Sequence, residues 1–349
     1  MRRRRICVCS VQVPFVRGGA EQLMDSLVEA LRVRGFEVDV VTMPLVTFPK
    51  RNVLESALSW RLLDLGNPIL PEIDLCIPLK FPAYALRHPV KVPWLLHQFR
   101  DAYDIFDSTY YHFTNAREDV EIRESVVEID NATLRECRHI YTISRNVSGR
   151  LMRYNGMKSE PLYPPPRHPE RYHSGPAGNT ILSVGRLEPI KRVDLLIRAL
   201  ARAPRDLRCV IVGEGSQREQ LARLIEDLEL GDRVQLVGRL DEESLLDLYA
   251  TCRAVYYAPF DEDYGYVTVE AFLSGKPVIT CSDSGGTLEF VEDRKSGWVV
   301  APEADAVADA LAAAARGGAE LKEMGWFGRD LVRDITWDRV VACLTQFLA

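Results

Sequence analysis

Short apolar stretches alternate along this chain with longer segments in which apolar residues recur at helical spacing. The first repeat has a strand in "RICVCSVQV", a helix from about Glu21 with Leu23 and Leu27 on one face, and a strand in "FEVDVVT". The alternation continues to Pro161 and restarts at about Thr180. Strict alternation of this kind predicts an α/β fold with parallel sheets that helices cover on both faces.

The segment between these two series indicates a domain boundary. Pro161 to Asn179 holds six prolines and lacks apolar periodicity, which is typical of a connection. A chain of 349 residues also exceeds the size at which one core stops growing. We expect an N-terminal domain over 1–165, a second domain over 176–335, and a helix over 336–349 that crosses back to the first domain. The two parallel sheets are expected to face each other across a cleft that holds the ligands.

Composition and charge narrow the class of protein. The net charge of -6 gives no reason to expect nucleic-acid binding. The run Arg2 to Arg5 is read as a solvated cluster, with attraction to anionic lipid headgroups as the alternative. Apolar runs stay below the length of a membrane span, and polar Ser10 and Gln12 interrupt the first one. We expect a cytoplasmic protein, with peripheral contact at the inner face of a membrane left open.

The eight cysteines are scattered, and their spacing is unsuited to zinc. Cys7, Cys9, Cys76, Cys209 and Cys281 fall inside apolar strands. We therefore expect reduced, mostly buried and chemically idle thiols.

The stretch from Ala258 to Thr280 carries the strongest chemical signal. It places Glu262 and Glu270 on either side of Gly265, in a loop between a strand and a helix. Ligands of open α/β sheets bind at such loops, outside the carboxyl ends of the strands. Glycine allows close approach to a ligand, helix-start amides face phosphates, and a carboxylate accepts hydrogen bonds from sugar hydroxyls. The pattern indicates a sugar-nucleotide site.

Two other loops add weaker signals. In "SVGRLEPIKRVD", Arg186 and Lys191 follow a strand that ends at Gly185, and two cations there can neutralise a diphosphate. Solvated loop cations explain the same residues equally well. In "VRGGAEQ", Gly18 and Gly19 follow the first strand, although Gly-Gly before a helix is also ordinary turn chemistry.

Taken together, these segments resemble the family-four retaining glycosyltransferases of the GT-B fold, which have two Rossmann-like domains. The resemblance covers nearly the whole chain and is specific mainly in residues 185–300. It implies a hexosyltransferase of class EC 2.4 that moves a sugar from a UDP- or GDP-sugar to a sugar or lipid-linked acceptor, with retention. It also implies that no metal cofactor is required, and it suggests a role in polysaccharide, glycolipid or other glycoconjugate synthesis.

The resemblance assigns roles to individual residues. It implies that Glu262 contacts hydroxyls of the donor sugar and that Glu270 accepts hydrogen bonds from the ribose. Arg186 and Lys191 are expected to clasp the diphosphate. Backbone amides that face the same diphosphate are expected at Gly265, Tyr266 and Val267.

Further assignments rest on the same resemblance. Gly18 and Gly19 are expected to close over the donor from the first domain. Gly213, Arg239 and Leu240 are expected to enclose the base.

Other features of the resemblance stay open. His97 lies where the family often has a histidine near the sugar, and a structural role is equally compatible with one isolated histidine. Asp263 and Tyr264 depart from the commoner family pattern, which leaves the donor open. A set of nearby aromatic residues fits core packing better than an acceptor groove: Tyr103, Phe106, Tyr110 and Tyr111.

Two alternatives remain at this stage. An NAD-dependent two-domain oxidoreductase would explain "GEGSQR", which nearly matches the dinucleotide fingerprint, but Arg218 stands where that fingerprint needs glycine or alanine. A non-catalytic nucleotide-sugar-binding protein would explain the fold, although it would be free to lose the four charged residues that are all present.

Overall fold

The structure is a computed structural model that describes the chain except residues 1, 14, 16–17, 68–71, 107–112 and 349. It divides into two compact units. The first unit comprises Met1–Arg167 and Ile335–Ala349, and the second comprises His168–Asp334. Strands within each unit run parallel, which confirms the predicted α/β class.

The described residues of the first unit form six short parallel strands. Its strands are β1 Arg5–Gln12, β2 Glu37–Pro44, β3 Leu75–Pro78, β4 Trp94–Leu95, β5 Tyr141–Thr142 and β6 Glu160–Pro161. They pair in the orders β2-β1-β3 and β4-β5-β6. A hydrogen bond of 2.7 Å from the Leu96 amide to the Leu79 carbonyl links the two groups just beyond β3 and β4. The α-helices of this unit are α1 Gly19–Val33, α2 Asn52–Leu62, α3 Arg117–Leu134, α4 Arg145–Asn155 and α11 Trp337–Thr345.

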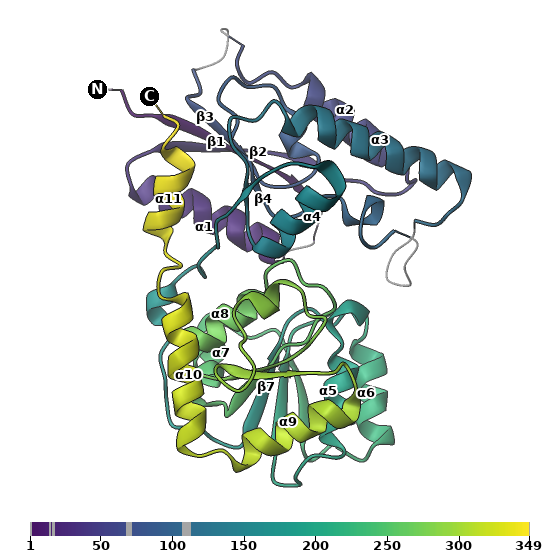
Figure 1. Cartoon of the computed structure of the whole chain (residues 1–349), viewed down its shortest axis with the longest axis vertical. Helices are drawn as coiled ribbons and strands as arrows, with labels where there is room; N and C mark the ends of the chain where they lie inside the picture. The colour runs from purple at the N-terminus through teal and green to yellow at the C-terminus, as the bar shows by residue number, and fades with distance from the viewer. Residues whose placement is uncertain (1, 14, 16–17, 68–71, 107–112, 349) are drawn as a thin grey trace. The chain divides into compact units, whose positions relative to one another are not determined.

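The last helix, α11, packs in the first unit although it is separated from it in sequence (Figure 1). Its Asp338 accepts a hydrogen bond of 3.0 Å from Nε of Arg34, just after α1. The indole of Trp337 donates to the Pro166 carbonyl at 3.0 Å and meets the ring of Trp94 edge-on at 6.2 Å. These contacts anchor the C-terminal helix to α1 and β4.

A buried polar cluster lies between α3 and the loops that precede it. The hydroxyls of Tyr84 and Tyr103 each donate to Asp130 at 2.7 Å, and all three side chains are buried. Burial raises the pKa of Asp130 to about 7, and the two hydroxyls partly oppose this shift. Tyr103 is therefore a core residue, as predicted, and the ring of Phe106 packs under Arg123. Tyr110 and Tyr111 lie outside the described residues.

The second unit is built on a six-stranded parallel sheet. Its strands are β7 Thr180–Val184, β8 Arg208–Val212, β9 Val234–Gly238, β10 Ala254–Tyr256, β11 Val278–Cys281 and β12 Gly297–Val300. Its α-helices are α5 Val193–Leu200, α6 Arg218–Asp227, α7 Glu242–Thr251, α8 Tyr266–Leu273, α9 Ala304–Arg316 and α10 Ala319–Val332. In Figure 1, α5 and α6 lie on one side of β7, and α7 and α8 lie on the other.

The strand order β12-β11-β10-β7-β8-β9 positions the candidate site. From β7 the chain proceeds outward through β8 to β9, and from β10 it proceeds in the opposite direction through β11 to β12. The loops that leave β7 and β10 therefore diverge from neighbouring strands, and such a switch point opens a crevice at the carboxyl edge of a parallel sheet. Arg186 and Lys191 lie on the first of these loops, and Glu262 lies on the second.

Helix faces follow the apolar spacing in the sequence. In α5, Leu196, Ile197 and Leu200 are fully buried, while Arg198 on the opposite face is exposed. Across the part of the chain that the structure describes, we find no helix both long and apolar enough to cross a bilayer.

Candidate functional site

The loop after β7 brings Lys191 against the loop after β10. Lys191 ends a short 3-10 turn, Pro189–Lys191, and its ammonium forms an ion pair with the Glu262 carboxylate. Both side chains are largely screened from solvent, with exposed fractions of 15% and 19%. Arg186, on the same loop, is exposed. The structure thus joins two residues that the sequence placed 71 positions apart.

Tyr257, directly after β10, links these charged groups. Its hydroxyl donates to Glu262 at 3.0 Å, and the Lys191 ammonium lies 3.5 Å from the hydroxyl and 5.7 Å from the ring centroid. Burial raises the pKa of Tyr257 well above its usual value; the charges of Glu262 and Glu270 add to this, and Arg186 opposes it. Lys191 and Glu262 therefore contact one buried tyrosine, and Glu270 and Arg186 act on its pKa through their charges.

Glu270 is held by two tyrosines that the sequence analysis did not single out. It lies in the second turn of α8, and Tyr249 of α7 donates to its Oε2 at 2.6 Å. Burial raises the pKa of Glu270, and hydrogen bonds from Tyr249 and Tyr172 lower it. The rings of Tyr172 and Tyr249 pack edge-on at 5.9 Å. The carboxylate is thus oriented by donors, and its other lone pairs can accept hydrogen bonds from a ligand.

Gly265 begins α8 in a conformation that favours glycine. Its φ of +84° is left-handed, and a Cβ there would lie 2.9 Å from the Tyr257 ring and 3.0 Å from the Thr287 hydroxyl. The amides of Tyr266 and Val267 follow in the first turn of α8. Amides of a first helical turn lack partners within the helix, so they are suited to an anion.

Arg192 is another residue that the sequence analysis missed. Its guanidinium makes a bidentate ion pair with Asp283 at 2.7 and 2.8 Å and donates to the Ala258 carbonyl at 2.8 Å. It therefore fixes the loops after β7, β10 and β11 against each other. A positively charged residue directly before the helix was the available signal, but its partner Asp283 lies 91 positions away.

Gly213 and its neighbours have a packing role in the structure. A Cβ at Gly213 would lie 1.9 Å from the Gly185 carbonyl oxygen, and its φ of +138° also excludes most side chains. Its amide donates to the Gly238 carbonyl at 2.8 Å.

Arg239 and Leu240 follow directly after β9, with Arg239 exposed and Leu240 half-buried. Close packing at the ends of β7, β8 and β9 accounts for Gly213 without a ligand, and enclosure of a base by these residues stays a prediction.

The three predicted residues of the first unit lie at the carboxyl ends of strands. Gly18 caps α1, and its amide donates to Glu21 at 2.8 Å, while Gly19 is the first residue of that helix. A Cβ at Gly18 would meet only the Glu21 carboxylate, at 3.8 Å, so packing does not require a glycine. His97 follows β4 half-buried, with Nδ1 2.6 Å from the Gln98 carbonyl.

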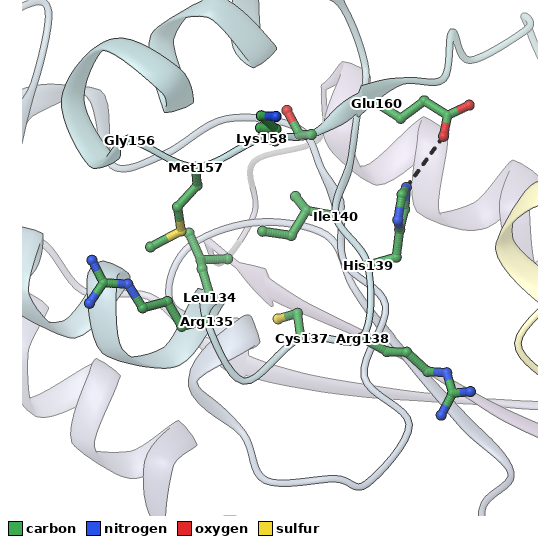
Figure 2. Close-up of a pocket in the computed structure, with 11 residues that line it drawn as sticks. Leu134, Arg135, Cys137, Arg138, His139, Ile140, Gly156, Met157, Lys158 and Glu160 are labelled. Atoms are coloured by element: carbon green, nitrogen blue, oxygen red, sulfur yellow. Dashed lines mark ion pairs between the residues drawn. The ribbon is translucent and has the colours of Figure 1, made fainter.

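A surface pocket elsewhere in the first unit contains none of the predicted residues. It lies where α3 and α4 end, before β5 and β6, and thus at the amino edge of these strands. Figure 2 shows its His139 paired with Glu160, at 3.4 Å. The predicted site residues instead follow the carboxyl ends of the strands.

Comparison with known proteins agrees with this geometry. The family model for "Glycosyl transferases group 1" matches residues 167–330, which is nearly all of the second unit. The second unit is thus similar to the group 1 glycosyl transferases over nearly its whole length. Over residues 167–330 this finding agrees with the glycosyltransferase resemblance on which the sequence analysis relied.

Curated relatives match part of the chain. A D-inositol 3-phosphate glycosyltransferase of Mycolicibacterium smegmatis is 35% identical over 122 residues, which is 34% of this chain and 28% of the relative. A GDP-mannose-dependent alpha-(1-6)-phosphatidylinositol monomannoside mannosyltransferase of Mycobacterium tuberculosis is 35% identical over 181 residues, covering 48% of this chain and 47% of the relative. The chain thus spans less than half the length of these two relatives.

Solved structures extend the likeness to the whole chain. HepE of Anabaena in complex with UDP and glucose has a TM-score of 0.72 at 18% identity, covering 97% of this chain and 99% of that one. Sucrose-phosphate synthase of Thermosynechococcus elongatus has a TM-score of 0.77 at 19% identity, covering 99% and 98%. At such identities the likeness shows the fold, which is GT-B.

Proposed function

We propose that this chain is a retaining glycosyltransferase that moves a sugar from a nucleoside-diphosphate sugar to an acceptor hydroxyl. The observation that supports this most directly is the cluster around Tyr257. Lys191 and Glu262 contact this side chain at the switch point of the second sheet, and Arg186 and Glu270 act on its pKa through their charges. Cations for a diphosphate and carboxylates for hydroxyls are therefore combined at one edge of one sheet.

Departure of the nucleoside diphosphate is the step in which Arg186 and Lys191 act. Negative charge builds on the leaving phosphate while positive charge builds on the sugar ring. Arg186, Lys191 and the first amides of α8 would stabilise that negative charge, and one well-placed donor is worth about 3 kcal/mol. We assign this work to side chains and amides and propose no metal cofactor. Glu262 would bind sugar hydroxyls, and Glu270 would accept hydrogen bonds from the ribose.

Retention follows in this proposal from attack on the face that the phosphate leaves. The acceptor oxygen bonds to the anomeric carbon while the bond from that carbon to the phosphate oxygen breaks. The acceptor proton passes to the departing phosphate. Gly18, Gly19 and His97 of the first unit are proposed to contribute contacts to the donor.

The names of similar proteins suggest classes of substrate. One relative is GDP-mannose-dependent, and HepE of Anabaena is known in complex with UDP-glucose. Another relative acts, by its name, on a diphospho-undecaprenol acceptor. We propose a UDP- or GDP-sugar donor and a sugar or lipid-linked acceptor in glycoconjugate synthesis, carried out by a cytoplasmic chain with peripheral membrane contact.

A donor panel tests the proposal. The purified chain is incubated with UDP-, GDP- and ADP-sugars, with and without extracts that contain acceptors, and released nucleoside diphosphate is quantified. The proposal is supported if nucleoside diphosphate is released from a UDP- or GDP-sugar and this release rises when acceptor is present. The release should also be lost in the Arg186→Ala and Lys191→Ala variants. Release that is equal in wild type and both variants contradicts it.

A further inference from the structure

Three cysteines of the first unit converge on one face of its sheet. Cys7 and Cys9 alternate along β1 and point the same way, and Cys76 on β3 is the register partner of Cys7. The sulfur atoms of Cys7 and Cys9 are 3.7 Å apart, and all three sulfurs lie within 4.8 Å of one another. The exposed fractions of these residues are 2%, 0% and 0%. The sequence analysis, which considered spacing along the chain, could not bring Cys76 to the other two.

The separation of these sulfur atoms matches a trigonal metal site. A bond of about 2.3 Å from a metal ion to each of three thiolates in a plane places the sulfurs roughly 4.0 Å apart. The separation of 3.7 Å between Cys7 and Cys9 is close to this value, and the other two separations do not exceed 4.8 Å, so the three sulfurs can reach one ion with small shifts. We propose that Cys7, Cys9 and Cys76 bind one thiophilic divalent cation of the zinc group, which would join β1 to β3.

The surroundings favour thiolate ligands and a divalent ion. The thiols pack against Trp60, Leu65 and other apolar residues, where sulfur ligands favour soft cations. Three thiols lose three protons on binding a divalent ion, so the site carries one net negative charge. Lys91, which is 1% exposed, is the backbone bridge partner of Cys76, and its ammonium is also paired with Glu136 at 3.4 Å. Its charge can therefore offset part of the charge of the metal complex.

Cadmium serves as the probe. The full chain carries Cys137→Ser and Cys343→Ser, because these two thiols are partly exposed and would bind cadmium nonspecifically. Burial of the site means that the ion enters as the chain folds, so the reduced chain is refolded with and without Cd²⁺. We expect one Cd²⁺ per chain, a sulfur-to-cadmium charge-transfer absorption, release of about three protons per ion, and a melting temperature raised by roughly 5 °C.

Matched variants distinguish the loss of the metal site from a general loss of core packing. Cys9→Ala is expected to weaken Cd²⁺ binding at least tenfold, whereas Cys209→Ala, at a buried cysteine of the second unit, is expected to leave it unchanged. Should Cys9→Ala fail to fold, Cys76→Val is tested in the same way with the core volume kept. Three outcomes overturn the proposal: no bound ion in the folded background chain, equal binding by the variant at position 9 or 76, or a disulfide among these cysteines in the mass spectrum.

Discussion

The ammonium of Lys191 is paired with the carboxylate of Glu262, and this contact joins the loops that leave the two central strands β7 and β10. Tyr257 donates to the same carboxylate at 3.0 Å. The cation is thus oriented by fixed partners rather than by solvent. In the proposed function this arrangement places positive charge where the leaving phosphate develops negative charge, without reorganisation during the reaction.

Removal of the Lys191 ammonium is expected to lower turnover roughly 100-fold, since a single preorganised donor is worth about 3 kcal/mol. Lys191→Ala is compared with wild type in steady-state release of nucleoside diphosphate. Arg198→Ala, on the exposed face of α5, serves as the control and should keep wild-type turnover. Equal turnover in wild type and the folded Lys191→Ala variant would exclude the leaving-group role.

Glu270 makes donor binding dependent on pH in a defined direction. Burial raises the pKa of this carboxyl, and the bond from Tyr249 lowers it. Once the carboxyl is protonated, its two oxygens can no longer both accept hydrogen bonds from the ribose hydroxyls. Affinity for the nucleotide-sugar should therefore fall as pH falls through that pKa. Tyr249→Phe removes a group that lowers the pKa, and the loss of affinity should therefore begin at higher pH.

Calorimetric titration with UDP and GDP across a pH series measures this shift. Tyr154→Phe in the first unit is the control and should reproduce the wild-type profile. An unchanged profile in Tyr249→Phe would count against the role assigned to Glu270.

The buried carboxyl of Asp130 links stability to pH. Its pKa is about 7 in the folded chain against an ordinary value of 3.8, so the native state holds a proton that the unfolded chain releases. The stabilisation from this group is complete below about pH 4 and is lost as pH rises to about 7, by about 4 kcal/mol in all. Denaturant unfolding at several pH values should show this loss in wild type.

Asp130→Asn is expected to abolish that component of the pH dependence. Asp309→Asn, at an exposed position of α9, should leave it intact. If Asp130→Asn and wild type lose the same stability between pH 4 and pH 7, the titration belongs to other groups.

Gly213 should tolerate no side chain. A Cβ would lie 1.9 Å from the Gly185 carbonyl oxygen, and relief would require β7 and β8 to separate. Gly213→Ala is expected to lower the free energy of unfolding by about 2 kcal/mol or more. Gly149→Ala within α4, where a Cβ meets no atom within 4 Å, should stabilise the chain by up to about 1 kcal/mol. Thermal unfolding of both variants checks this contrast.

Local sequence was sufficient to predict the helices and strands. It was also sufficient to predict those residues of the candidate site that lie within one continuous segment. The strand that leads to Tyr257, the glycine at position 265 and the helix that carries Glu270 are each encoded within one continuous segment. Apolar spacing also predicted the buried face of α5. Such features depend on neighbours a few positions away, which a single sequence displays.

Partners from distant segments could not be predicted in the same way. The contacts of Tyr172 and Tyr249 with Glu270, and of Arg192 with Asp283, depend on strand order and register. The same limit applies to the cysteine cluster, since register alone sets Cys76 beside Cys7. The prediction of buried cysteines is confirmed for the five strand thiols, whereas their chemical idleness is what the cadmium experiment tests.

The crystal structure of the chain in complex with the nucleoside diphosphate selected by the donor panel is the most direct test of the central claim. We predict a diphosphate within hydrogen-bonding distance of Arg186, Lys191 and the first amides of α8, with the ribose hydroxyls on Glu270. A nucleotide bound elsewhere, with these residues making no contact to it, would contradict the account.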